Sequence, residues 1–184
     1  ALTHPAMSLT LNLARQHDIV NERIKAIRVK TNRRITNALI HDRPRNALEA
    51  KFSMPFCLAI VLAERRAGLA EFTDEIVGRT DVQNLISKIN YTSFDEPGSD
   101  YTNVTTLLEI DFTDGETITG RADFAPGSTA DPMGFDDVAE KFRDCADYVG
   151  WPVEKSTQAI AMVKRLGDLK NIAELVRPLS ARAS

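Results

Sequence analysis

The fold of this chain is decided by one stretch, Glu49-Ala-Lys-Phe-Ser-Met-Pro-Phe-Cys-Leu-Ala-Ile-Val-Leu-Ala-Glu-Arg-Arg-Ala-Gly68. Apolar residues continue for eight positions from Phe56, which is typical of a helix that is buried on every side. Ser53 suits the N-cap position and Pro55 suits the first turn. We expect a helix over residues 54–67, closed by Gly68, at the centre of the core.

A positive charge stands directly before this helix, at Lys51. A helix N-terminus offers backbone N–H groups and partial positive charge, so the pair suits a carboxylate or a phosphate. The alternative is an ordinary capped helix with a solvated lysine. From the residues alone the ordinary reading is favoured, because capped helices far outnumber ligand sites.

Residues 104–124 predict a β-hairpin, and their pattern sets its register. A two-residue turn would place Asp111 opposite Ile118 and mix the two faces. A three-residue loop with Gly115 in the left-handed conformation places Ile110 opposite Ile118 and keeps one face apolar. We therefore predict the three-residue loop.

The remaining periodicities predict helices at both ends of a small sheet. Residues 24–31 alternate as a strand, and residues 33–40 suggest a second, weaker strand. An amphipathic helix begins at Phe135. The predicted helices cover residues 5–17, 54–67, 74–77, 82–88, 135–149, a segment from Pro152 and a segment around 172–176. The pattern indicates an α+β fold with a small, largely antiparallel sheet, and we treat residues 1–184 as a single domain.

The amino-acid composition excludes several classes of protein. The 184 residues carry a net charge of −3, with 43% hydrophobic and 27% charged residues, which argues against disorder and against a dedicated nucleic-acid binder. Neither a membrane span nor a signal peptide is evident, so we expect a cytoplasmic protein. Cys57 and Cys145 lie in apolar helical contexts typical of reduced core cysteines. The chain opens without methionine, which suggests a cut through a longer protein; the alternative is a processed N-terminus.

Few residues suggest chemistry directly. His4, before the first helix, could act as a general acid or base, although an ordinary helix-start residue explains it as well. No pair of histidines has metal-ligand spacing, so we expect no metal site. Residues 23–34 contain six basic side chains, which suggests an anion-attracting or RNA-binding face; the alternative is an exposed strand face.

The stretch Glu49-Ala-Lys-Phe-Ser-Met-Pro-Phe56 resembles the signature of the MmgE/PrpD family, whose members include dehydratases, decarboxylases and epimerases. Thr3-His4, residues 22–31, and the stretch from Asp114 through Asp131-Pro-Met133 to Phe142 are similar to other family segments in the same order. The resemblance implies the smaller, C-terminal domain of a two-domain enzyme. It also implies a helical N-terminal domain that shares the active site and is missing from this chain.

In the family, acid–base chemistry acts beside carboxylates of small di- and tricarboxylic acids, with no organic cofactor. The resemblance makes His4 a catalytic candidate and Lys51, Ser53 and Phe56 substrate-binding candidates. Phe56 stands where several members have tyrosine, so it lacks a hydroxyl and places dehydratase and decarboxylase activity in doubt.

The leading hypothesis is therefore the C-terminal part of a lyase or isomerase, inactive as this chain alone. We expect a small polycarboxylate substrate, the family's helical domain and a second copy of the enzyme as partners, and no nucleic acid or membrane. The alternative is a non-catalytic dimerisation or scaffold module with the same fold.

Overall fold

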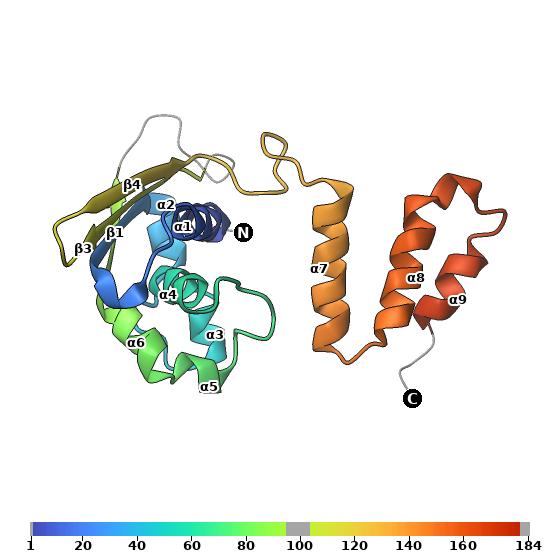
Figure 1. Cartoon of the computed structure of the whole chain (residues 1–184), viewed down its shortest axis with the longest axis horizontal. Coiled ribbons are helices and arrows are strands. Elements are labelled where there is room, and N and C mark those ends of the chain that lie inside the picture. The colour runs from blue at the N-terminus through green and yellow to red at the C-terminus, as the bar shows by residue number, and fades with distance from the viewer. Residues whose placement is uncertain (1, 95–103, 181–184) are drawn as a thin grey trace. The chain divides into compact units, whose positions relative to one another are not determined.

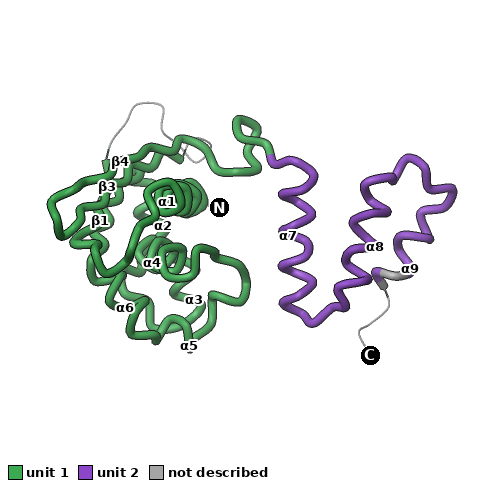
Figure 2. The backbone as a smooth tube through the Cα atoms, in the orientation of Figure 1, with its two compact units in different colours: residues 1–132 green, residues 133–184 purple. Residues whose placement is uncertain are grey.

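The computed structural model describes residues 2–94 and 104–180, and these form two compact units, residues 1–132 and 133–184 (Figure 2). The α+β class is confirmed, because a mixed sheet packs with helices in unit 1 (Figure 1). The elements of unit 1 are α1 (His4–Gln16), η1 (Asn21–Arg23), β1 (Ile24–Asn32), α2 (Arg33–Ala38), α3 (Ala47–Ala50), α4 (Met54–Glu64), α5 (Asp74–Val77), α6 (Thr80–Ser87), β2 (Ile89–Phe94), β3 (Thr106–Phe112) and β4 (Thr117–Ala122). Unit 2 contains α7 (Phe135–Tyr148), α8 (Val153–Lys164), η2 (Leu166–Asp168) and α9 (Ala173–Ser180).

The sheet has the strand order β2-β1-β3-β4, with β1 and β2 parallel and the other two pairs antiparallel. The predicted hairpin register is confirmed, since Ile110 pairs with Ile118 and Gly115 has a φ of 91°. The parallel strand β2 was not predicted. It enters the sheet beside β1 after the chain has passed through α2 to α6.

The predicted strand over residues 33–40 is wrong, because the chain turns into α2 after β1. The side chain of Asn32 accepts a hydrogen bond from the N–H of Ile35 at 3.1 Å, which is the geometry of an N-cap. This cap stabilises a helix where strand propensity alone suggested extended chain.

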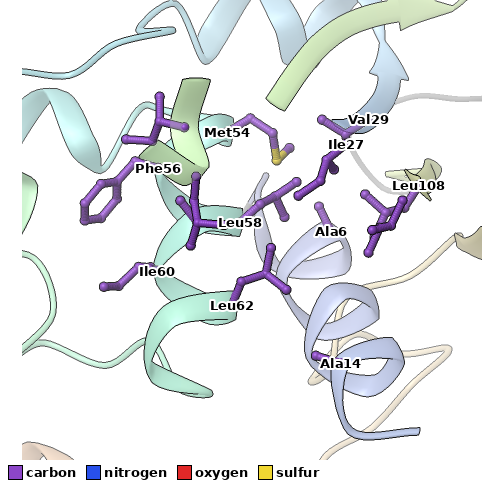
Figure 3. Packing of buried hydrophobic residues seen from close by; sticks show 14 of the residues in the cluster. Ala6, Ala14, Ile27, Val29, Met54, Phe56, Leu58, Ile60, Leu62 and Leu108 are labelled. Carbon is purple, nitrogen blue, oxygen red and sulfur yellow. The ribbon is translucent and has the colours of Figure 1, made fainter. Parts of the chain in front are cut away.

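The predicted central helix is confirmed as α4, in which all residues from Met54 to Leu62 are buried. It ends earlier than predicted, at Glu64, because Arg65 takes the left-handed conformation with a φ of 56°. The helix α4 contacts α1 and β2, and Figure 3 shows its Met54 near Ile27 and Val29 of the sheet, whereas Leu108 of β3 lies beside Ala6 of α1. The core of unit 1 is therefore built around α4.

Unit 2 is helical and keeps little of its apolar surface buried. The helix predicted from Phe135 is confirmed as α7, but its apolar stripe is largely exposed in this structure, with Val138 at 55% and Val149 at 69%. Phe142 and Trp151 form an edge-to-face pair with ring centroids 5.9 Å apart.

Candidate functional site

The two segments that carry the predicted site residues lie side by side in unit 1. The helices α1 and α4 pack against each other (Figure 3). Thr3, just before α1, shares a hydrogen bond with the thiol of Cys57, whose Sγ lies 3.9 Å from the carbonyl oxygen of Ala50. His4 follows Thr3 and Lys51 follows Ala50, so the fold brings these two exposed residues to one end of the unit.

This is the end at which the parallel strands β1 and β2 finish. At the opposite end, Asn21 Nδ2 donates to the carbonyl oxygen of Leu62 at 3.0 Å, and the Arg65 guanidinium donates to that of Ile19. Both contacts tie the last turn of α4 to the segment just before β1 begins at Ile24. The start of α4 therefore faces the carboxyl end of β1, where ligands of parallel sheets usually bind.

The start of α4 uses most of its own hydrogen-bond donors. Ser53 is fully buried, and its Oγ accepts from the N–H of Phe56 at 3.1 Å. The Ser53 N–H donates to the carbonyl oxygen of Ala50, and Pro55 has no N–H. At most the N–H of Met54, a fully buried residue, is left for a ligand. The positive charge of Lys51, rather than the helix end, is what this region offers a carboxylate.

Phe56 is a core residue in this structure. Its side chain is fully buried, and its ring packs against Phe72 with centroids 5.3 Å apart. Figure 3 shows its ring on a different side of α4 from Met54, which points toward Ile27 and Val29. Contact between Phe56 and a substrate stays a prediction.

Sequence reasoning missed Tyr91, which lies at the same end of the unit. Its OH and the Oγ1 of Thr31 form a hydrogen bond of 2.7 Å at the carboxyl end of β1. Burial raises the pKa of Tyr91 to about 12, the hydrogen bond to Thr31 lowers it, and the charge of Asp42 raises it. The spacing of Ile89 and Tyr91, two positions apart with polar residues between and after them, was the signal for the strand that carries this tyrosine.

Buried polar side chains gather at this end of unit 1. Those that are less than 9% exposed are Thr3, Thr31, Asn32, Ser53, Thr105 and Thr106. Thr31 and Thr106 are register partners on neighbouring strands, and Thr105 Oγ1 donates to Asp123 at 2.8 Å. Thr106 Oγ1 has no hydrogen-bond partner among the described residues. Closer to the start of β1, the inner face of the sheet is apolar and is formed by Val29 and Ile27.

Two of the six basic residues of the predicted basic face, Arg23 and Arg28, are paired with carboxylates. Arg28 forms ion pairs with Glu109 and Asp111 of β3, and Arg23 pairs with Asp114. The hydrogen bonds with Arg28 hold the pKa values of Glu109 and Asp111 below their usual range. A shallow groove of about 410 Å³ crosses this face, lined mainly by Arg28, Lys30, Leu107, Glu109, Thr119 and Arg121. The exposed-strand interpretation fits this arrangement better than an RNA-binding face.

The described ranges, 2–94 and 104–180, contain no group of three or more His, Cys, Asp or Glu side chains placed to hold a metal ion. None of their helices combines the length and apolar character needed to cross a membrane.

Comparison with known proteins agrees with the resemblance seen in the sequence. The family model for the MmgE/PrpD C-terminal domain matches residues 1–166. The human protein cis-aconitate decarboxylase is 26% identical over 145 residues, which covers 77% of this chain and 30% of that protein. The match thus spans less than a third of the relative. This chain belongs to the MmgE/PrpD family, within which it matches the C-terminal domain.

Proposed function

We propose that the chain is the C-terminal part of a lyase or isomerase that acts on small di- or tricarboxylates without an organic cofactor. The match of residues 1–166 to the family's C-terminal domain carries this proposal. The likeness to cis-aconitate decarboxylase, whose name states a tricarboxylate substrate, supports it.

The placement of the side chains suggests their roles. Lys51 is exposed beside the start of α4, which Ser53 caps, so its ammonium group can pair with a substrate carboxylate. His4 is exposed on the neighbouring helix start and can exchange a proton at a carbon next to that carboxylate. Ser53 is buried and caps α4, and Phe56 is buried in the core, so contact of either residue with a substrate stays a prediction. The family's helical domain would complete the site, and a second copy would complete the enzyme.

The main experiment uses the polypeptide in its natural length, assayed on cis-aconitate, 2-methylcitrate and iminodisuccinate. We expect turnover of at least one substrate. The change Lys51→Ala should raise KM by roughly 10- to 100-fold, because a charged hydrogen bond contributes about 1.5–3 kcal/mol. The change His4→Ala should mainly lower kcat, by roughly 100-fold or more.

Matched controls come from the same elements. Lys25 is an exposed lysine of β1, and His17 is an exposed histidine at the far end of α1, so Lys25→Ala and His17→Ala should leave both constants unchanged. Failure of the natural-length protein to bind or convert any of the three acids would rule out the polycarboxylate proposal.

A second candidate is a non-catalytic module of the same fold. The complete burial of Ser53 and Phe56, each with a structural contact, favours it. Under this proposal, Lys51→Ala and His4→Ala leave the turnover of the natural-length enzyme unchanged. A large loss of activity with an unchanged melting temperature would exclude it.

A further inference from the structure

We propose that Tyr91 donates a hydrogen bond to a substrate carboxylate at the candidate site and that Thr31 positions its hydroxyl. This inference rests on the proposed function and adds a residue to the site. Contacts at the carboxyl end of the parallel strands carry it.

The phenol of Tyr91 lies at the carboxyl end of β1. Tyr91 is partly exposed, and in the parallel register it stands beside Val29, while its OH extends along β1 to Thr31. The next residue, Asn32, caps α2, so the phenol lies where β1 ends and α2 starts. It joins the buried threonines Thr31 and Thr106 at the polar end of the inner sheet face.

Residues 41 and 42 lie between the phenol of Tyr91 and the segment that carries Lys51. Asp42 is close enough to Tyr91 for its charge to act on the phenol. The neighbouring residue His41 donates its backbone N–H to the carbonyl oxygen of Phe52 at 3.3 Å. Residues 41–42 therefore connect the region of Tyr91 to Phe52, the residue that follows Lys51. The cation and the phenol border the same end of unit 1.

The hydroxyls of Thr31 and Tyr91 share one hydrogen bond, in which either can be the donor. Thr31 is fully buried, so its O–H proton needs an acceptor inside the protein, and the Tyr91 oxygen lies 2.7 Å away. If Thr31 donates, the phenol oxygen accepts, and the proton of Tyr91 remains available on its partly exposed side. This arrangement satisfies the buried hydroxyl and directs one donor outward.

The phenol also keeps its proton under working conditions. Burial raises the pKa of Tyr91 to about 12, so the hydroxyl is neutral across the physiological range. A neutral phenol at the same end of unit 1 as Lys51 can donate to a carboxylate without adding negative charge to the site. A neutral hydrogen-bond donor together with the cation of Lys51 suits an acid with several carboxylates.

A purely structural tyrosine would show the same pair of hydroxyls, so the test must separate the two roles. In the natural-length protein, Tyr91→Phe removes only the hydroxyl. We expect kcat/KM for the converted polycarboxylate to fall roughly 10- to 100-fold, the loss of one hydrogen bond to a charged group. The dissociation constant of tricarballylate, a non-reacting tricarboxylate, should rise by a similar factor in calorimetric titration. The melting temperature should change by no more than about 4 °C.

Two further variants complete the design. Thr31→Val leaves the phenol in place without its partner, and we expect a smaller loss of kcat/KM than for Tyr91→Phe. Tyr148→Phe, at a tyrosine of α7 that is 54% exposed, serves as the control and should change neither constant.

The outcomes are distinct. Turnover by the parent with kcat/KM of Tyr91→Phe within twofold of the parent value would overturn the role of Tyr91 and leave the proposed function standing. A lower melting temperature with unchanged kcat/KM and tricarballylate binding in both variants would show a structural pair and overturn it as well. A parent that neither converts nor binds any polycarboxylate would overturn both proposals.

Discussion

The close approach of α1 to β4 at Gly120 yields a prediction with a calculable size. A Cβ built on Gly120 would lie 2.9 Å from Leu9 Cδ1 and 3.0 Å from Leu13 Cδ1. Carbon atoms in contact normally stand about 3.5–4.0 Å apart, so both leucines would have to move by roughly 0.5–1 Å. Gly120→Ala therefore overpacks the interface between α1 and the sheet.

Two opposing effects set the magnitude. Overpacking of a well-packed core costs about 1–3 kcal/mol, whereas replacing glycine by alanine lowers the entropy of the unfolded chain and returns about 0.4–1 kcal/mol. We expect Gly120→Ala to lower the free energy of unfolding by about 1–2 kcal/mol. The melting temperature should fall by roughly 2–8 °C.

The assay is urea unfolding followed by circular dichroism and by tryptophan fluorescence. The chain has a single tryptophan, Trp151, in unit 2, so its fluorescence follows unit 2, whereas circular dichroism follows the helices of both units and its midpoint should fall. The control is Gly78→Ala, whose Cβ would meet its nearest atoms at an ordinary 3.5 Å. This variant should be neutral or slightly stabilised.

A double-mutant cycle tests the cause. Truncating Leu9 to alanine removes one of the two close methyl groups, so Gly120→Ala should cost less in that background than in the parent. The reasoning is refuted if Gly120→Ala is as stable as the parent, or if its cost is the same with and without the Leu9 side chain.

Three further predictions follow from single contacts. Thr106→Val removes a fully buried hydroxyl that has no partner among the described residues, so urea unfolding should show an increase in stability of up to about 1 kcal/mol. Because of Arg28, the pKa values of Glu109 and Asp111 are lower in the folded state than in the unfolded state. The stability that these carboxylates give the folded state is therefore present above their unfolded pKa, near 4, and is lost as the pH falls further. A melting-temperature profile should therefore flatten below about pH 4 in Arg28→Met, whereas an unchanged profile would contradict the ion-pair role. Burial raises the pKa of Cys57 to about 12, so mass spectrometry at pH 8 should find it unlabelled by iodoacetamide in the native protein and labelled in denaturant.

The sequence predicted those parts of the fold that have a strong local signal. Eight consecutive apolar residues specify a fully buried helix, and the hairpin has one register that keeps its apolar face whole. The error at residues 33–38 came from a cap, because Asn32 folds back on Ile35 and local hydrogen bonding outweighs strand propensity. The early end of α4 depends on Arg65 adopting a left-handed conformation that is uncommon for arginine.

The candidate site was only partly accessible from sequence. Lys51 and Ser53 stand out beside a proline at a helix start, and His4 was a candidate acid or base that the family resemblance strengthened. The pairing of Tyr91 with Thr31 joins residues 60 positions apart. It depends on a parallel strand that arrives after five helices, and no local pattern encodes that pairing.

The position of β1 in the sheet also sets the order in which the protein can form during synthesis. Both neighbours of this strand, β2 and β3, leave the ribosome long after it does, and the last residue of β3 is Phe112. At ordinary translation speeds the delay is on the order of ten seconds. Once α4 has been synthesised, its nine buried residues have no complete sheet to pack against until β3 follows. The nascent chain therefore exposes the apolar surface of α4 during that time.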